Sequence, residues 1–224
     1  LGSSQTKNRA LNRFDSSDGV IQCAHGTSTS VDQARPASAS IAAAFPPSLP
    51  SIRHVVINTI QSQQIASRYG LAARVIPNVM DFDSPPPASD SYSETVRADF
   101  EIRDGEYFFL QPTRVIQRKG IEHAIELMRR LELPAKLIIS HAAGDEGTAY
   151  EHRLREYANL LNVTVRFEAD QVQDERGTTD DGKKIYTLDD VYPRADLITY
   201  PSAIEGFGNA FLEAVYYRRL ILVS

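Results

Sequence analysis

Residues 107–140 read YFFLQPTRVIQRKGIEHAIELMRRLELPAKLIIS, and this stretch holds the pattern that sets the fold. The apolar runs YFFLQ (107–111) and KLIIS (136–140) each predict a buried strand. Between them, GIEHAIELMRRL (120–131) predicts an amphipathic helix, because apolar residues recur at the spacing of one helix face. These residues are Ile121, Ala124, Ile125, Met128 and Leu131. A strand, a helix and a second strand in this order indicate a parallel βαβ unit.

The same alternation continues to the end of the chain. Further strands are predicted at VTVRF (163–167), DLITY (196–200) and LILV (220–223), and further helices at 148–161, within 187–195 and at 209–219. Uncharged strands that alternate with helices indicate a parallel sheet covered on both faces. We therefore predict an α/β fold, with a Rossmann-like domain over residues 100–224.

The region before residue 100 has a weaker pattern. Residues 1–52 are rich in Ser, Thr, Asn, Asp and Ala, and the prolines of FPPSLP (45–50) interrupt any helix, so we expect a low-complexity or disordered leader. HVVIN (54–58) predicts a strand, and TIQSQQIASRYG (59–70) predicts a helix that ends at Gly70. The prolines of RVIPNVMDFDSPPP (74–87) indicate a linker.

Composition narrows the class of protein. The net charge of −5 argues against general binding to nucleic acid or to a membrane surface. No apolar run reaches the roughly 18 residues of a membrane span, and no leader peptide is recognisable. The single cysteine, Cys23, cannot form an internal disulfide, which fits a cytoplasmic location. Cys23 and His25 alone are weak grounds for a metal site, and we expect none. The first residue is Leu and the last strand is short, so we expect a fragment.

Ligands of a parallel sheet bind outside the carboxyl ends of its strands. Four loops follow predicted strands, at 112–120, 141–147, 168–184 and 201–209. We expect all four loops to gather along one edge of the sheet. The long polar loop at 168–184 also fits a solvated insertion.

Three cations in the first of these loops point to an anion. Arg114, Arg118 and Lys119 lie between a strand and the start of a helix, where positive charge opposes the helix dipole. A bound phosphate would resolve this conflict, since guanidinium and ammonium groups bind phosphate through charge-assisted hydrogen bonds. A solvated loop with chance charges is the alternative.

The last loop, EGFGNAFLE (205–213), combines glycines with two carboxylates. Gly206 and Gly208 expose backbone amides at a helix start, where Asn209 is the expected N-cap. Glu205 and Glu213 would lie up to ~12 Å apart along the axis if the whole interval were helical. That spacing suits the two ends of an elongated ligand better than an acid–base pair, although two ordinary helix acids would also fit. Beside the cations of 112–120, this loop predicts a pocket for a nucleotide-sugar.

At this point a family resemblance is visible. SAIEGFGNAFLEA (202–214) resembles the E-x7-E signature of retaining glycosyltransferases with the GT-B fold, the group 1 family. TRVIQRKGIEHAIELM (113–128) is similar to the family's phosphate-binding segment, and RVIPNVMDFD (74–83) to its interdomain hinge. VIPNVMDFD and LIISHAAGDEG (137–147) are most similar to synthases of the mannosylglucosylglycerate type. The resemblance covers about residues 53–224, which implies that 53–87 is the remnant of an N-terminal domain with the interdomain linker, and that 100–224 is a truncated nucleotide-sugar-binding domain.

The resemblance also implies roles for particular residues. Arg114 and Lys119 would bind the donor diphosphate, and Glu213 the ribose hydroxyls. Glu205 would be the catalytic residue that contacts the transferred hexose. The backbone amides expected beside it belong to Gly206, Phe207 and Gly208. His54 and His141 are further candidates for catalysis, although structural roles are favoured for both.

The activity that the resemblance implies is transfer of a hexose, with retention of configuration, from a nucleotide-sugar such as GDP-mannose or UDP-glucose. The acceptor would be a small molecule or a glycan, and neither a metal nor a cofactor would be required. Two alternatives stay open: a non-catalytic nucleotide-binding remnant or interaction domain, and a sugar-nucleotide epimerase of the same architecture. The wide spacing of the glutamates argues against a glycosidase with paired carboxylates.

Overall fold

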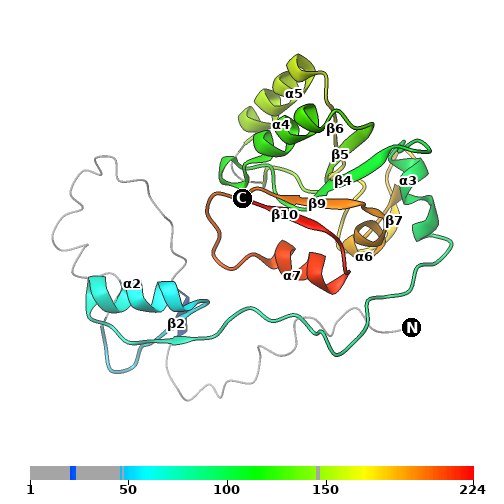
Figure 1. Ribbon diagram of the computed structural model, residues 1–224. Helices are drawn as coiled ribbons and strands as arrows, with labels where there is room; N and C mark the ends of the chain where they lie inside the picture. Colours follow the sequence, from blue (N-terminus) through cyan, green and yellow to red (C-terminus); the bar gives the residue numbers. More distant parts are fainter. Residues whose placement is uncertain (1–20, 24–45, 47, 145–146) are drawn as a thin grey trace. The chain divides into compact units, whose positions relative to one another are not determined.

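The structure, a computed structural model, describes residues 21–23, 46, 48–144 and 147–224 (Figure 1). The chain divides into two compact units, Leu1–Asn78 and Val79–Ser224. Most of the predicted leader, His25 included, lies outside the described residues.

The first unit holds a small parallel sheet with the strand order β1-β2-β3. Its strands are β1 (Ile21–Cys23), β2 (Arg53–Val56) and β3 (Ala73–Val75), and helix α2 spans Thr59–Tyr69. The Asn58 side chain caps α2 by accepting a hydrogen bond from the Gln61 amide at 2.8 Å. Gly70, with a φ of 65°, ends the helix as predicted. His54 lies buried in β2.

The second unit holds a five-stranded, all-parallel sheet with the order β10-β9-β4-β5-β6. Its strands are β4 (Tyr107–Gln111), β5 (Ala135–Ile139), β6 (Thr164–Phe167), β9 (Leu197–Tyr200) and β10 (Ile221–Val223). Its helices are α3 (Val96–Asp99), α4 (Ile121–Leu131), α5 (Ala149–Leu161), α6 (Leu188–Val191) and α7 (Asn209–Tyr216), with 3-10 turns at Ser93–Thr95, Gln117–Lys119 and Tyr192–Arg194. The predicted Rossmann-like fold is confirmed, with α4 and α5 over one face of the sheet and α6 and α7 over the other (Figure 1).

Two apolar cores flank the sheet because neighbouring residues of a strand point to opposite faces. In β4, Phe109 packs into the core under α4 and α5, whereas Phe108 and Leu110 pack into the core on the side of α7. The predicted apolar face of α4 is buried except at Leu131, which is 42% exposed. Leu131 is the last residue of that helix, so the buried face ends at Met128, three residues earlier than the pattern predicts.

The order of the strands places two loops side by side. From β4 the chain continues to β5 and β6 on one side and later returns to β9 and β10 on the other. This reversal is a topological switch point, where ligands of open α/β sheets bind. The loops that leave the carboxyl ends of β4 and β9 meet there.

The two loops touch through their backbones. Gly120 has a φ of 61°, and a Cβ atom on it would lie 2.3 Å from the carbonyl oxygen of Pro201. The Ala203 amide donates to the carbonyl of Arg118 at 3.1 Å. A side chain at position 120 would therefore push the two loops apart.

Buried polar side chains join the two strands just below these loops. The Thr199 hydroxyl donates to the Gln111 side-chain oxygen at 2.7 Å, and the Gln111 amide donates to the Thr113 hydroxyl at 2.9 Å. All three residues are almost fully buried. Satisfied polar groups of this kind fix one arrangement of the strand ends.

Only part of the loop at 168–184 stays with the other three loops. It contains a hairpin, β7 (Gly177–Thr178) and β8 (Lys184–Ile185), which lies beside α3 (Figure 1). Tyr92 precedes α3, and its hydroxyl donates a hydrogen bond to the carbonyl of Gly177 at 2.9 Å. Because α3 binds through Arg97 to Glu106 and Asp196, at the amino ends of β4 and β9, the hairpin lies away from the shared edge. The charge of Asp174, in the same loop, still acts on His141 after β5, so the expectation that four loops share one edge holds for only part of this loop.

Replacement of Gly120 by alanine tests the close approach of the loops. Gly105 is the matched control, since it also has a positive φ, of 80°, but a Cβ atom on it would meet no atom of the described residues within 4 Å. Both substitutions incur about 1–2 kcal/mol for left-handed backbone. We expect Gly120→Ala to lower the free energy of unfolding by roughly a further 1–3 kcal/mol from overpacking, as measured in urea. Equal losses in the two variants would contradict the close approach.

Candidate functional site

The candidate site lies where the loops after β4 and β9 meet. The Lys119 ammonium donates a hydrogen bond to Oε1 of Glu205, and Nη1 of Arg118 lies 3.8 Å from Oε2 of the same carboxylate. The side chains of Lys119 and Glu205 are 12% and 21% exposed, whereas that of Arg118 is 43% exposed. The fold therefore joins a cation and a carboxylate that the sequence placed in separate loops.

This ion pair changes the electrostatic argument about the first loop. Lys119 ends the 3-10 turn Gln117–Lys119, directly before α4 begins. Positive charge at that point is unfavourable to the helix dipole, and the Glu205 carboxylate neutralises much of it. The charge conflict is resolved inside the chain, so it is not by itself an argument for a bound anion.

The pKa of Glu205 reflects two opposing effects. Burial raises the pKa of the Glu205 carboxyl. The hydrogen bond from Lys119 and the charge of Lys119 lower it by more, so the pKa lies below its ordinary value. Burial, together with the neighbouring Glu205 carboxylate, raises the pKa of Tyr200. Glu205 is thus an ionised carboxylate at neutral pH.

Helix α7 begins differently from the prediction. Gly208 occupies the N-cap position with a φ of 93°, and Asn209, the predicted cap, is the first helical residue. A Cβ atom at Gly208 would lie 3.3 Å from the Tyr200 hydroxyl, and the N-cap residue itself, a glycine, has no side chain to cap the helix. The amides of a helix start attract anions.

The later helix start also changes the spacing of the two glutamates. Glu205 lies in the loop, four residues before α7 begins, and only Glu213 lies within the helix. The estimate of ~12 Å assumed a helical rise over the whole interval and does not apply. The Tyr192 hydroxyl donates to Oε2 of Glu213 at 2.8 Å, so Glu213 is a half-buried, held carboxylate instead of an ordinary surface acid.

Arg114 belongs to the loop after β4, and its side chain lies beside the neighbouring loop that follows β5. A Cβ atom at Gly144 would lie 3.7 Å from Nη1 of Arg114. His141 follows β5, with its Nδ1 atom 2.7 Å from the Ser140 hydroxyl. Burial lowers the pKa of His141; the charge of Asp174 opposes this effect, and the charge of Arg114 adds to it. The structure thus places Arg114 and His141 near one another, while Lys119 and Glu205 form their own pair.

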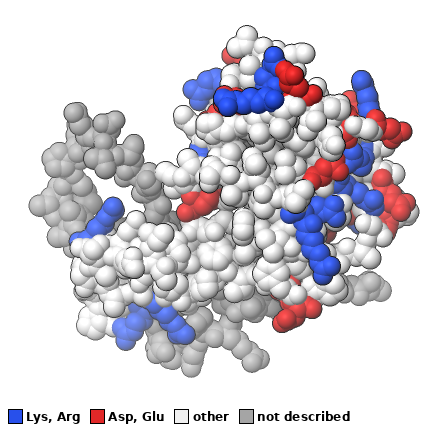
Figure 2. Space-filling model, in the orientation of Figure 1, with Lys and Arg blue, Asp and Glu red and all other residues white. Residues whose placement is uncertain are grey.

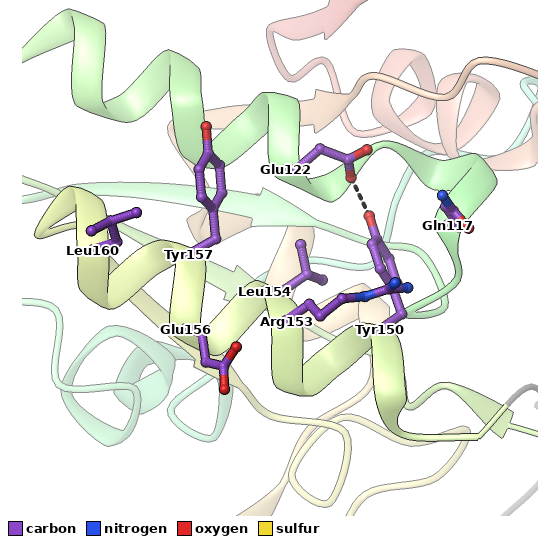
Figure 3. A pocket seen from close by; sticks show the side chains of 8 residues that line it. All are labelled: Gln117, Glu122, Tyr150, Arg153, Leu154, Glu156, Tyr157 and Leu160. Carbon is purple, nitrogen blue, oxygen red and sulfur yellow. Dashed lines mark hydrogen bonds between the residues drawn. The ribbon is translucent and has the colours of Figure 1, made fainter.

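A hollow of about 500 Å³ lies on the outer side of α4 and α5 (Figure 3). In it the Tyr150 hydroxyl donates to Glu122 and accepts a hydrogen bond from the Ile121 amide at 3.2 Å. Tyr150 therefore satisfies the first amide of α4, whose N-cap residue is a glycine. The residues that line the hollow do not include the predicted site residues.

Charges of both signs lie beside one another on the face shown in Figure 2. Within the described ranges, no three His, Cys, Asp or Glu residues form a group that could hold a metal ion. None of the described helices is long and apolar enough to cross a membrane.

Comparisons with known proteins agree with the geometry. No protein-family model matches the chain. The chain is 31% identical over 195 residues to mannosylglucosylglycerate synthase of Thermotoga maritima, a match that spans 80% of the chain and 43% of the relative. It is 32% identical over 200 residues to the synthase of Petrotoga mobilis, across 80% of the chain and 45% of the relative. The chain thus spans less than half the length of these curated relatives.

Solved structures share the fold at lower identity. HepE of Anabaena, in complex with UDP-glucose, matches with a TM-score of 0.61 at 15% identity, over 76% of this chain and 44% of that one. A glycosyltransferase of Rickettsia africae matches with a TM-score of 0.59 at 15% identity, over the same shares of the two chains.

The fold is therefore that of part of a GT-B glycosyltransferase, as the resemblance in the motifs predicted. Within that class, the chain is related to the mannosylglucosylglycerate synthases.

Two tyrosines of this site were missed by the sequence reasoning. Tyr192 is fully buried and bonds Glu213, and Tyr200 ends β9 next to Glu205. From the sequence, aromatic residues in a short helix or at a strand end are predicted to be core residues. Their hydroxyl contacts cannot be predicted, because these depend on segments that are distant in the chain.

The ionised pair predicts how stability depends on pH. Because the folded pKa of Glu205 is lowered, its contribution is present above the ordinary value of 4.5 and is lost as pH falls through the folded pKa. We expect Glu205→Gln to be less stable than the parent at pH 7, with a difference that shrinks towards pH 3. Urea unfolding at several pH values measures this difference. In a Lys119→Met background the same substitution should have much less effect, and a difference that is independent of pH would refute the pairing.

Proposed function

We propose that the chain carries the donor-binding part of a hexosyltransferase, which transfers a hexose from a nucleotide-sugar to an acceptor hydroxyl with retention of configuration. The observation that carries the proposal is the convergence of Lys119, Glu205 and the start of α7 at the switch point of the sheet. Cations, amides and a carboxylate are the groups that a sugar diphosphate requires. The sequence similarity to mannosylglucosylglycerate synthases supports the same class of enzyme.

Each group has a proposed role in binding the donor. Arg114, Lys119 and the amides of residues 206–209 bind the diphosphate. Glu205 accepts hydrogen bonds from hydroxyls of the hexose, and Glu213 from those of the ribose. An ammonium has three donors, so Lys119 can contact a phosphate while it keeps its bond to Glu205. The ion pair then holds the carboxylate in place beside the diphosphate.

The proposed reaction breaks the bond between C1 of the hexose and the phosphate oxygen. The acceptor oxygen forms the new bond to C1 on the same face, and its proton passes to the departing phosphate oxygen. Arg114, Lys119 and the helix amides stabilise the negative charge that develops on the diphosphate, so no metal is required. Glu205, bound to Lys119, is not placed in the role of a nucleophile.

The names of the relatives suggest the donor. Mannosylglucosylglycerate synthases are named for a mannosylated product, and HepE has been solved with UDP-glucose. We therefore propose GDP-mannose or UDP-glucose as the donor and a small sugar-containing molecule or a glycan as the acceptor. Nucleic acid is not among the proposed partners, and the cytoplasm stays our expectation for the location.

Titration with UDP-glucose and GDP-mannose, followed by calorimetry, tests donor binding. We expect one of the two to bind, with or without EDTA, and Lys119→Met to weaken binding by about 10- to 100-fold, because a charge-assisted contact to phosphate is lost. Lys183→Met is the matched control, since Lys183 also pairs with a carboxylate, Asp181, in the remote hairpin. Equal affinities in the Lys119→Met variant and the parent would refute the donor site.

A second prediction concerns the hexose. Glu205→Gln should bind UDP or GDP at least as tightly as the parent, because Lys119 loses a competing carboxylate. The same variant should lose most of the extra affinity for the sugar-bearing donor, by about 5- to 10-fold. An unchanged preference for the nucleotide-sugar would remove Glu205 from hexose binding. Binding of a donor without transfer to any acceptor would favour the non-catalytic alternative, and a changed hexose in the released nucleotide-sugar would favour the epimerase.

A further inference from the structure

One fully buried tyrosine, Tyr192, binds a carboxylate of the candidate site through its hydroxyl. Tyr192 begins the 3-10 turn after α6, and its side chain is fully buried. Its ring stacks on that of Tyr217, with centroids 4.9 Å apart and planes 17° from parallel. The ring position is therefore fixed by packing in the core on the side of α7.

The hydroxyl of Tyr192 meets α7 at two points. It donates to Oε2 of Glu213 at 2.8 Å and lies 3.3 Å from the carbonyl oxygen of Ala210. A hydroxyl has one proton, and the shorter contact to a charged acceptor is the stronger hydrogen bond. Burial, together with the neighbouring Glu213 carboxylate, raises the pKa of Tyr192, which keeps the hydroxyl a neutral donor.

A long carboxylate side chain on a helix surface ordinarily samples several rotamers, and binding a ligand must then restrict them. The hydrogen bond from Tyr192 holds one oxygen of Glu213, and so fixes the direction of the carboxylate before a ligand arrives. The bond comes from a buried, packed ring, so its position does not depend on the ligand.

We propose that Tyr192 is a positioning residue for Glu213. The Tyr192 hydroxyl does not touch the donor, but it sets the affinity for the ribose because it holds the Glu213 carboxylate in place. This inference rests on the proposed function, since it deepens the role given there to Glu213. It distinguishes the two held oxygens of the site: Glu205 is fixed by the cation Lys119, whereas Glu213 is fixed by a neutral hydroxyl.

The test compares a nucleotide with and without its ribose hydroxyls. UDP and GDP, and their 2′,3′-dideoxy forms, are titrated against the parent and against Tyr192→Phe, which keeps the stacked ring. We expect the parent to prefer the ribonucleotide by about 10-fold and Tyr192→Phe by only about 2- to 3-fold, with affinity for the dideoxy form unchanged. A loss of packing would instead weaken both forms equally.

Tyr186→Phe is the matched control. Tyr186 is also fully buried, and its hydroxyl also donates to a carboxylate, that of Asp99, at the amino end of the sheet. This variant should keep the 10-fold preference. The same 10-fold preference in Tyr192→Phe would overturn the inference.

A double-mutant cycle gives a second, independent measurement. In a Glu213→Ala background, Tyr192→Phe should leave the affinity for the ribonucleotide unchanged, because its effect passes through Glu213. An undiminished further loss there would show that Tyr192 acts only on the fold. If the parent binds nucleotide without preference for ribose hydroxyls, the role of Glu213 is wrong and this inference falls with it, whereas absence of any nucleotide binding would overturn the proposed function itself.

Discussion

The contact between the backbone of Gly120 and the carbonyl of Pro201 is the constraint on which the rest of the site depends. It exists because β4 and β9 are neighbours in the sheet although a long stretch of chain separates them. The strand order brings the two loops to one place, and the missing side chain at position 120 lets them touch. At that separation Lys119 and Glu205 form an ion pair.

The ion pair gives the site a defined charge state before any ligand binds. Burial alone would raise the pKa of the Glu205 carboxyl, whereas Lys119 lowers it, so that Glu205 stays ionised at neutral pH. The amides at the start of α7 add positive potential to the same place. Cation, carboxylate and helix start therefore form one preorganised unit, which is what transfer of a group from a diphosphate requires.

Much of this could be predicted from local patterns, because apolar runs and helical spacing are local properties. The strands of the five-stranded sheet, the helices α4, α5, α6 and α7, and the two loops with Lys119 and Glu205 follow from them, whereas α3 was not predicted. The N-cap at Gly208 did not follow, since it depends on a positive φ beside Tyr200. The hairpin at 177–185 is short and polar, and contacts with Tyr92 hold it. The role of Tyr192 likewise depends on a partner 21 residues away in the chain.

The two loops of the site lead into helices that pack on two different apolar cores, one on each face of the sheet. The Lys119 loop leads into α4, which rests on the core that contains Phe109, while the Glu205 loop leads into α7, which rests on the core that contains Phe108 and Leu110. A change of volume in one core therefore acts first on the loop that leads into the helix packed on that core. Substitutions far from the candidate site can in this way alter one side of it more than the other, with the contact residues themselves unchanged.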